Sequence, residues 1–432
     1  MDLNLAPLLA DPLPLGTKGL PPRAAGLTLG QIGSQGWNVL RGELPLPVAV
    51  LKEEALAHNL RVMRTFAAST RARLAPHGKT TMSPQLFQMQ LAHGAWAMTA
   101  ATVSHVALYR RFGVSRILLA NQLVDPVAIE YVLDELERDP EFELLSLADS
   151  REGVDRLSCA SVRRGSTRPL QLLLEAGAPG GRTGLRTVDE MIALARHIKS
   201  VPGVELRGVE AFEGVLSSSG NPRGDNPVRA LLDRMKQCIA RLEELDLLAP
   251  GRRVVSAGGS ALFECVAHEL GALEGGFDLV LRSGCYLTLD HGLYLRALED
   301  PSRADPAAVR LTEALMPALE IWAHVQSRPE RELAIAAFGK RDASHDAGLP
   351  VPIAWFRPGM HSKPAALGPD LASVTALNDQ HAYLKVNSDH PLATGDLVCF
   401  GISHPCTTFD KWQLLYRVNA DYDVTGGIRT FF

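Results

Sequence analysis

Short apolar runs alternate with amphipathic segments through the middle of the chain, from about residue 71 to residue 290. The runs are rich in leucine or β-branched residues, and there are eight of them: ARLAP (72–76), WAMTAA (96–101), RILLAN (116–121), FELLSL (142–147), LQLLLEAG (170–177), ELRGVEAF (205–212), RVVSAGG (253–259) and DLVLRSG (278–284). Continuous apolar strands that alternate with helices are typical of a parallel sheet covered on its outer side. Eight such units within about 220 residues predict a (β/α)8 barrel of the TIM type.

Helix signals lie between these runs. Ser83 followed by Pro84 is typical of a helix N-cap with proline at the first helical position. The sequence Thr-Val-Asp-Glu at 187–190 is a capping box, and apolar residues follow it at helical spacing. Both signals predict helices that connect successive strands of the barrel.

The pattern changes after about residue 311. ELAIAAF, HAYLKVN, DLVCFG and WQLLYRVNADYDV are strand-like, are separated by turn residues and show little helical periodicity. The stretch LPVAVLKEEALAHNLRVM at 46–63 predicts a strand followed by a helix that bridges the two parts. We therefore predict an N-terminal extension (1–45), a barrel domain (46–310) and an appended C-terminal β-domain (311–432).

Composition narrows the class of protein. The 432 residues carry 44 Lys+Arg and 48 Asp+Glu, and this net charge of −4 argues against nucleic acid or an anionic membrane as a partner. The longest apolar runs are far below the ~18 residues that span a bilayer. None of the six cysteines forms a CxxC pair, which argues against a zinc ribbon or a disulfide framework. The cysteine pattern leads us to expect a reducing, cytoplasmic compartment. Asp2 and interrupting prolines near the N-terminus do not suit a signal peptide.

The C-terminal ends of the strands are where such a barrel carries its active site. Here these ends are rich in glycine and polar residues: PHGKT (76–80), EAG (175–177) followed by GRTG (181–184), FEG (212–214), GGS (258–260) and RSGCY (282–286). A buried lysine such as Lys79 loses its proton readily and forms a Schiff base with an aldehyde. Glycine-rich turns after the seventh and eighth strands offer backbone N–H groups to a phosphate. This combination predicts a pyridoxal-phosphate barrel, although a solvated lysine and ordinary turn glycines are the alternative.

With these residues, the chain resembles the fold-type III pyridoxal-phosphate enzymes, in particular the branch of D-serine dehydratases and D-threonine aldolases. The barrel of that family is of the alanine racemase N-terminal type. The resemblance runs from LPVAVLKEEALAHNL to the C-terminus and is carried by PHGKT (76–80), EAGAPGGRTG (175–184), GVEAFEG (208–214), SAGGS (256–260), LRSGCY (281–286), FGKRDASHDAGLP (338–350) and SHPCTTFDKW (403–412). The family often has tyrosine where this chain has Phe212, and histidine near Thr81 and Met82.

The resemblance implies a Schiff base between Lys79 and pyridoxal 5'-phosphate. It implies a divalent metal ion at His404 and Cys406, and a homodimer whose active site lies between a barrel and the partner's β-domain. The residues that it implies for the phosphate and the ring are His77, Arg182, Phe212, Gly258, Gly259, Ser260, Gly284, Cys285 and Tyr286. A structural histidine at His77 and an exposed turn arginine at Arg182 are the alternatives, and Arg182 would also suit a substrate carboxylate.

The pair His404 and Cys406 can also be assessed without the resemblance. His404 and Cys406 are two residues apart, so in an extended segment both side chains would project to the same face. Pro405 between them restricts the backbone, and imidazole and thiolate are ordinary donors to zinc. The alternative is a loop histidine beside a buried cysteine. No third ligand is evident from the sequence, so substrate or water would complete the shell.

These features favour dehydration and deamination of a D-amino acid, most directly D-serine, to pyruvate and ammonia. Lys79 would then remove the α-proton, and the metal would polarise the β-hydroxyl group. Other D-β-hydroxy amino acids, including 3-hydroxyaspartate, remain open as substrates, as does the group that faces the pyridine nitrogen.

Three other functions are alternatives to the dehydratase. In a D-threonine aldolase, the family resemblance implies a histidine after the sixth strand, where this chain has the sequence FEGV at 212–215. A non-catalytic pyridoxal-phosphate carrier resembles a lone barrel of about half this length, without a β-domain. Alanine racemase activity requires a second base, and no matching motif is apparent.

Overall fold

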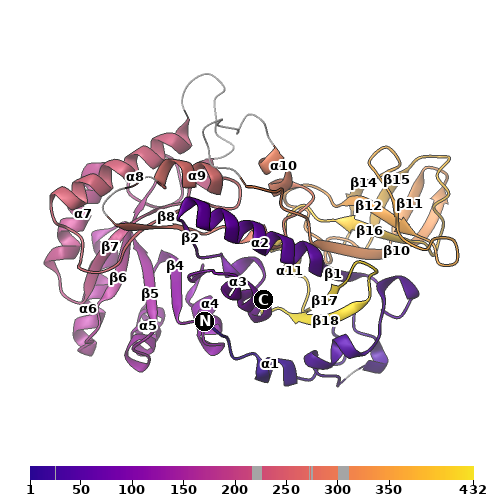
Figure 1. Cartoon of the computed structure of the whole chain (residues 1–432), viewed down its shortest axis with the longest axis horizontal. Helices are drawn as coiled ribbons and strands as arrows, with labels where there is room; N and C mark the ends of the chain where they lie inside the picture. Colours follow the sequence, from indigo (N-terminus) through magenta and orange to yellow (C-terminus); the bar gives the residue numbers. More distant parts are fainter. Residues whose placement is uncertain (25, 217–225, 272, 274–275, 300–310) are drawn as a thin grey trace.

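The computed structural model describes residues 1–24, 26–216, 226–271, 273, 276–299 and 311–432. Two sheets organise this part of the chain: one of eight parallel strands and one of ten mainly antiparallel strands. In Figure 1 the two lie end to end along the long axis, and the helix α2 (Glu53–Thr70) runs across the region where they meet. Within these ranges, no helix is both long and apolar enough to cross a membrane.

The eight predicted strands are all present and form a barrel. Their order is β2-β9-β8-β7-β6-β5-β4-β3, and β2 and β3 are joined by a parallel bridge between His77 and Thr99. The N–H of Trp96 also donates to the carbonyl of Leu74 at 2.7 Å. The bounds are β2 (Arg73–Leu74), β3 (Met98–Ala100), β4 (Arg116–Gln122), β5 (Glu143–Ala148), β6 (Leu170–Ala176), β7 (Val204–Ala211), β8 (Arg253–Ala257) and β9 (Phe277–Leu281). The predicted fold, a TIM-type barrel with an appended β-domain, is confirmed.

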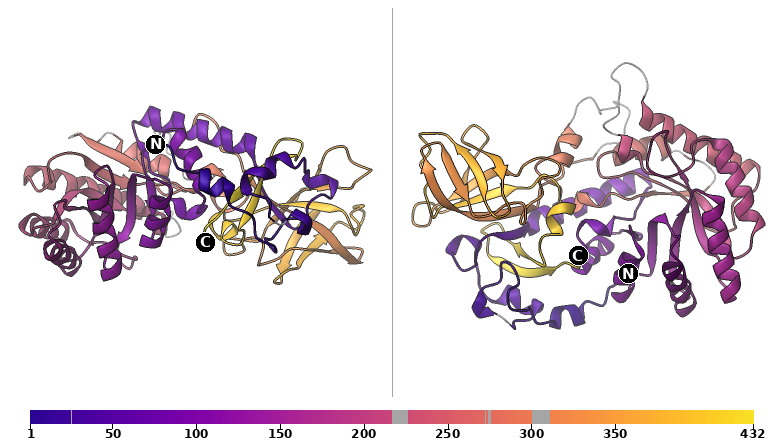
Figure 2. Two further views of the ribbon diagram at one scale, coloured as in Figure 1. Left: turned by 90° about the horizontal axis from the view of Figure 1, so that it is seen from below. Right: turned by 180° about the vertical axis from the view of Figure 1, so that it is seen from behind.

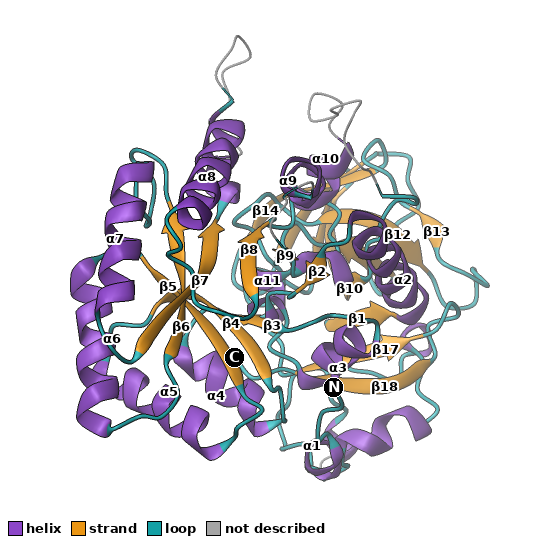
Figure 3. Cartoon of the chain, turned by 60° about the vertical axis from the view of Figure 1, so that its left-hand side comes forward, coloured by secondary structure: helices purple, strands orange, loops and turns teal. Residues whose placement is uncertain are grey.

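Helices cover the outer face of the barrel, as Figure 3 shows for the side formed by β4–β7. They are α3 (Pro84–Ala92), α4 (Val103–Arg111), α5 (Pro126–Arg138), α6 (Arg151–Arg164), α7 (Val188–Ser200), α8 (Pro227–Glu244) and α9 (Phe263–Leu270). The helix α10 (Leu293–Glu299) lies instead where the barrel meets the β-domain, and the N–H of Leu293 donates to the carbonyl of Ser403 at 3.2 Å. The predicted capping box of α7 is confirmed, because the Thr187 hydroxyl accepts from the N–H of Glu190 and the Glu190 carboxylate accepts from the N–H of Thr187. Ser83 stands at the N-cap of α3, but its side chain makes no capping hydrogen bond.

The barrel interior is filled rather than open. Buried apolar side chains from its strands form one cluster there: Ala75, Ala97, Leu118, Leu145, Leu147, Leu173, Val254 and Val280. A filled interior leaves the ends of the strands as the place for polar chemistry.

The second sheet has the strand order β13-β12-β16-β10-β1-β17-β18, and β11, β15 and β14 extend it from β10. Its strands are β1 (Val48–Lys52), β10 (Leu319–Glu330), β11 (Leu333–Ala336), β12 (Val351–Phe356), β13 (Ala365–Ala366), β14 (Ala372–Leu377), β15 (Ala382–Val386), β16 (Leu397–Gly401), β17 (Leu414–Val418) and β18 (Val424–Arg429). A short helix, α11 (Cys406–Phe409), connects β16 to β17.

The strand predicted at the start of 46–63 belongs to this second sheet. β1 pairs antiparallel with β10 and parallel with β17, while the helix that follows it packs on the barrel. The range 46–310 predicted for the barrel therefore includes one strand that completes the β-domain. The physical reason is burial: Val48 and Val50 are fully buried between the sheet and the N-terminal segment.

The N-terminal segment covers one face of the β-domain. It contains the helix α1 (Ala6–Ala10) and three 3-10 turns at 22–24, 29–34 and 39–41. Its buried side chains, among them Leu8 and Ile32, form a single cluster with Trp322 and Tyr416 of the sheet. In both views of Figure 2 this indigo segment runs beside the yellow C-terminal strands.

Hydrogen bonds join the barrel to the β-domain near the first barrel strand. Gln85 of α3 donates to the carbonyl of Gly427 at 2.8 Å and accepts from the N–H of Arg429 at 2.9 Å. The N–H of Phe431 donates to the carbonyl of Met82 at 3.0 Å. These contacts hold the last strand, β18, against the segment that follows Lys79.

Candidate active site

Lys79 lies in the mouth of the barrel, on the 3-10 turn Gly78–Thr80 that follows β2. The turn requires glycine at 78, because a Cβ there would lie 2.3 Å from the Tyr109 hydroxyl. The lysine side chain is exposed, so the expectation of a buried lysine is wrong for the protein chain alone. The reason is local: β2 ends at Leu74, so Lys79 stands on the turn that follows the strand and not within the barrel wall.

Two histidines lie close to the Lys79 amine. Burial, and after it the positive charge of Lys79, lowers the pKa of both His77 and His105. The ring Nδ1 of His77 is buried and has no hydrogen-bond partner within the described part of the chain. Both rings are thus held neutral beside the lysine, and sequence reasoning missed His105, which lies on α4.

The loops that follow β8 and β9 are joined at the same end of the barrel. The N–H of Cys285 donates to the Ser260 hydroxyl at 3.1 Å. Gly284 has no room for a side chain, since a Cβ would lie 2.6 Å from the carbonyl oxygen of His77. Within the described ranges, the backbone N–H groups of Ser260, Ala261 and Gly284 have no acceptor. Three unsatisfied donors therefore lie on two joined loops.

A buried carboxylate occupies the donors that precede Ser260. Glu213 is fully buried, and its two oxygens accept from the N–H of Gly258 at 3.1 Å and of Gly259 at 2.6 Å. Gly258 and Gly259 were expected to present these groups to a phosphate, and the structure gives them to Glu213 instead. No pattern in the sequence marks this contact, which joins residues 45 and 46 positions apart.

Tyr286 lies behind the loops. Its side chain is buried, hydrogen-bonds Gln90 of α3, and has a pKa raised by burial. Of the residues predicted in this loop, Tyr286 thus contributes to packing against the helix.

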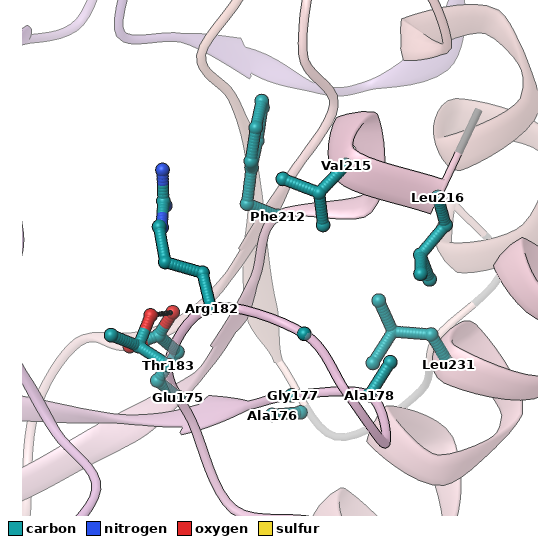
Figure 4. Close-up of a pocket in the computed structure, with 11 residues that line it drawn as sticks. Glu175, Ala176, Gly177, Ala178, Arg182, Thr183, Phe212, Val215, Leu216 and Leu231 are labelled. Atoms are coloured by element: carbon teal, nitrogen blue, oxygen red, sulfur yellow. Dashed lines mark hydrogen bonds between the residues drawn. The ribbon is translucent and has the colours of Figure 1, made fainter. Parts of the chain in front are cut away.

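A hollow lies at the ends of β6 and β7, and it brings together two predicted residues (Figure 4). The Arg182 guanidinium lies 5.4 Å from the centre of the Phe212 ring, within the range of a cation–π contact. In Figure 4 both side chains extend in the same direction, away from Ala176 and Gly177. Arg182 is exposed there and free to meet an anionic group.

The floor of this hollow is an acidic side chain that the sequence did not single out. The Glu175 carboxylate is buried and accepts from the Thr183 hydroxyl at 2.5 Å and from the Gln122 amide. These bonds tie β6 to β4 and to the loop that carries Arg182.

An ion pair is buried between β7 and the end of β9. The Arg282 guanidinium contacts the Glu210 carboxylate and donates to the carbonyl of Ala211 at 2.9 Å. Burial, followed by the negative charges of Glu175 and Glu213, raises the pKa of Glu210 to about 7, although Arg282 opposes this shift. Oε2 of Glu210 has no hydrogen-bond partner in the described part of the chain, so this carboxyl is poised to hold a proton.

His404 and Cys406 lie beside the turn that carries Lys79. The Cys406 sulfur is 3.5 Å from the Thr80 hydroxyl, and the two side chains of the pair hydrogen-bond each other. The expectation of an extended segment is wrong: Pro405 has helical backbone angles (φ −60°, ψ −46°) and stands at the N-cap of the helix α11. Among the described residues, no three His, Cys, Asp or Glu side chains form a ready-made metal centre.

Hydrogen bonds hold both side chains of this pair in place. Nδ1 of His404 lies 2.7 Å from the Asp346 carboxylate, which fixes the orientation of the ring. Hydrogen bonds from Cys285, then from His404 and Thr80, hold the pKa of Cys406 well below its ordinary value despite burial. Thiolate is the form of cysteine that binds metals. The sequence indicated neither Asp346 nor Thr80 as a partner.

The comparisons with known proteins agree with this architecture. Residues 51–290, more than half of the chain, match the family model "Alanine racemase, N-terminal domain". The chain belongs to this family, the fold-type III pyridoxal-phosphate enzymes. Residues 318–418, within the β-domain, match the model "Putative serine dehydratase domain".

Several relatives of this fold-type III chain carry named activities. It is 25% identical to a 3-hydroxy-D-aspartate aldolase of Paracoccus denitrificans, over 71% of this chain and 75% of the relative. It is also 25% identical to a D-threonine aldolase of an Arthrobacter species, over 79% and 80% of the two chains. A D-threo-3-hydroxyaspartate dehydratase of a Delftia species is 24% identical over 57% of this chain and 62% of the dehydratase.

Solved structures share the fold. A D-threonine aldolase from Filomicrobium marinum superposes with a TM-score of 0.72 at 21% identity, covering 91% of this chain and 97% of the aldolase. A cysteine-to-alanine variant of D-threo-3-hydroxyaspartate dehydratase in the metal-free form has a TM-score of 0.69 at 20% identity, covering 90% and 98%.

Proposed function

We propose that this chain uses pyridoxal phosphate to dehydrate a D-β-hydroxy amino acid, with D-serine as substrate and pyruvate and ammonia as products. One observation carries the proposal. The lysine turn Gly78–Thr80 and the pair His404–Cys406 lie side by side, with 3.5 Å between the Thr80 hydroxyl and the Cys406 sulfur. An amine for the α-carbon and a metal pair for the β-hydroxyl are thus available at one place.

The residues of the barrel mouth fit the cofactor. The exposed Lys79 amine would attach it, and the free N–H groups of Ser260, Ala261 and Gly284 would accept its phosphate. His77, whose Nδ1 lacks a partner in the described chain, lies against the lysine as a wall for the ring. When bound, pyridoxal phosphate supplies the electron sink that makes the α-proton of an amino acid removable.

Residues of the chain would perform the proton transfer and bind the substrate. The Lys79 amine would be the base that takes the α-proton of the substrate. The rings of His77 and His105 are neutral, so they place no second positive charge beside that amine. The exposed guanidinium of Arg182, packed over Phe212, binds the substrate carboxylate.

His404 and Cys406 would hold a divalent ion, for which zinc suits the nitrogen and sulfur donors. Such an ion supplies a Lewis acid for the departing hydroxide. One relative supports the assignment: the histidine and the cysteine that were each replaced by alanine in D-threo-3-hydroxyaspartate dehydratase are two positions apart in its chain, and its cysteine variant was solved in the metal-free form. His404 and Cys406 have the same spacing.

The aldolase reaction is the second candidate, because two of the relatives named above are aldolases. It requires a base for the β-hydroxyl proton. Within 212–216, the described residues that directly follow β7, the one titratable side chain is Glu213, whose carboxylate is fully buried and already accepts two backbone N–H groups. The dehydratase reaction needs no such base.

A homodimer would complete the site. The mouth around Lys79 and Arg182 is exposed in the single chain, and water there would compete with the substrate for the base. The proposal is that the partner's β-domain covers this opening. Sedimentation of the loaded enzyme is expected to give a dimer, and a fully active monomer would contradict this part of the proposal.

Product analysis tests the proposed reaction. The cofactor-loaded protein is mixed separately with D-serine, D-threonine and D-threo-3-hydroxyaspartate, with and without a chelator, and Lys79→Ala is the control. A keto acid and ammonia, lost on chelation and absent from the control, are expected. Glycine and acetaldehyde from D-threonine would instead show an aldolase, and turnover of 3-hydroxyaspartate alone would replace D-serine as the substrate.

A further inference from the structure

A second cysteine lies against the metal pair. The sulfur atoms of Cys285 and Cys406 are 3.7 Å apart, although the two residues are 121 positions apart in the chain. Cys285 begins the 3-10 turn Cys285–Leu287 directly after β9, while Cys406 begins α11 in the β-domain. The two thiols therefore meet where the barrel and the β-domain touch.

We propose that Cys285 is the third protein ligand of the metal ion, which makes the site a Cys2His centre shared by the barrel and the β-domain. This inference rests on the proposed function for the presence of the ion. It supplies the ligand that neither the sequence pattern nor a ready-made cluster in the structure provides.

The separation of the two sulfur atoms suits a shared ion. Zinc–sulfur bonds are about 2.3 Å long, and tetrahedral coordination then places two sulfur ligands about 3.8 Å apart. The observed 3.7 Å leaves room for an ion between them, whereas a disulfide would require the sulfurs to approach to about 2.05 Å. Binding releases the Cys285 thiol proton to solvent.

The other polar groups around the pair are already engaged. Asp346 lies on Nδ1 of His404, on the opposite side of the ring from Nε2, and also accepts from the Thr407 hydroxyl at 2.7 Å. The Asp290 carboxylate accepts backbone N–H groups of Gly292 at 2.7 Å and Tyr294 at 3.1 Å. Asp346 and Asp290 thus orient the site, and Cys285 is the neighbour whose sulfur faces that of Cys406.

Cys285 is also well placed by its own backbone. Its N–H is fixed on the Ser260 hydroxyl at 3.1 Å, and its sulfur lies 3.8 Å from the Thr80 hydroxyl and hydrogen-bonds the Tyr294 phenol. With three protein ligands, one position stays open for the substrate hydroxyl, as in other catalytic zinc sites. The same residue then links the proposed phosphate loop to the metal.

Cobalt serves as the probe, because thiolate-to-cobalt absorption grows with the number of thiolate ligands. Reduced, metal-free, cofactor-loaded protein is titrated with Co²⁺ as wild type, Cys285→Ser and Cys406→Ser, with the exposed Cys159→Ser as matched control. We expect wild type and Cys159→Ser to give a two-thiolate band. Cys285→Ser should lose about half of it and bind cobalt at least about tenfold more weakly.

Three other results would contradict the inference. An unchanged band and affinity in Cys285→Ser would leave a His404–Cys406 site and the proposed function intact. The absence of any band in wild type would remove both the ligand and the metal-assisted reaction. A thiol titre that falls by two in unreduced wild type but not in Cys285→Ser would show a disulfide instead.

A measurement on the unsubstituted enzyme covers the case of a variant that does not fold. X-ray absorption of the zinc-loaded wild type counts sulfur ligands directly, and two are expected. A single sulfur ligand would contradict the inference, whatever the variants do.

Discussion

At the scale of single residues, the barrel mouth is unusual for its buried carboxylates. Glu175, Glu210 and Glu213 all lie within the barrel end, and Arg282 is the cation that faces Glu210. Buried charges are costly unless they are paired or protonated. Glu213 is stabilised by two backbone N–H groups, whereas Glu210 keeps one oxygen without a partner in the described residues.

Glu210 makes the stability of the protein depend on pH. Its pKa rises from 4.5 to about 7 on folding, mainly through burial, so the stability that its proton confers is complete below about pH 4.5 and is lost as the pH rises through 7. The difference between the two pKa values corresponds to about 3 kcal/mol of unfolding free energy, at about 1.4 kcal/mol for each pH unit. In Glu210→Gln this contribution is absent, and we expect a flatter dependence of the unfolding free energy between pH 4.5 and 7.

Urea denaturation at several pH values between 4.5 and 8 measures this difference. The comparison uses the slope, because the substitution also removes the partner of Arg282 and lowers stability at every pH. Equal slopes in the wild type and the variant would contradict the assignment.

The sequence indicated some residues of the candidate site and missed others, for a physical reason. Lys79 was found because a lysine after a strand, near glycine-rich strand ends, is a local signal. Glu213 and His105 were missed because their roles come from contacts between distant segments. Gly258 and Gly259 were identified as important, but their N–H groups serve a carboxylate that no spacing rule indicates.

At the scale of elements, the eight barrel strands follow the hydrophobic pattern closely. The first is the exception: β2 is regular only over Arg73–Leu74 and continues as an isolated bridge at His77, because Pro76 cannot donate a ladder hydrogen bond and the chain turns at Gly78. Pro405 also departs from the expected extended conformation, because it stands at the N-cap of α11 with a helical ψ of −46°. The side chains of His404 and Cys406 nevertheless meet, because they hydrogen-bond each other.

The capping box of α7 gives a prediction at this scale. Thr187→Ala removes the hydroxyl that accepts from the N–H of Glu190, and a loss of about 0.5–2 kcal/mol in unfolding free energy is expected. Ser83→Ala is the matched control, since Ser83 occupies an N-cap without a capping bond and its hydroxyl has no partner in the described residues.

Chemical denaturation of both variants beside the wild type is the measurement. A smaller loss in Thr187→Ala than in Ser83→Ala would show that the box does not stabilise the helix.

At the scale of the whole molecule, the β-domain is assembled from both ends of the chain. β1 inserts between β10 and β17, and the N-terminal segment covers the sheet that they form. The sequence pattern located the strand and the helix of 46–63 and their bridging position. It did not predict that residues 1–45 cover the sheet. Their apolar residues have no helical or strand period, and they are buried only by contact with the sheet.

We therefore expect the N-terminal segment to carry stability for the whole protein. Ile32 is fully buried in the cluster with Trp322 and Tyr416, so Ile32→Ala should lower the unfolding free energy by about 2–5 kcal/mol. Leu15→Ala, at a side chain that is 76% exposed, is the control and should stay within about 0.5 kcal/mol of wild type.

Thermal and urea unfolding of the two variants test this expectation. If Ile32→Ala behaved like Leu15→Ala, the segment would be a loosely attached extension rather than a part of the β-domain.

The central claim is that the mouth of the barrel holds pyridoxal phosphate on Lys79, and one measurement tests it directly. The cofactor-loaded protein is reduced with borohydride, digested, and its peptides are analysed by mass spectrometry. The account predicts one modified peptide that contains Lys79, and none in Lys79→Ala. A modification at any other lysine, or no stable modification of the wild type, would contradict it.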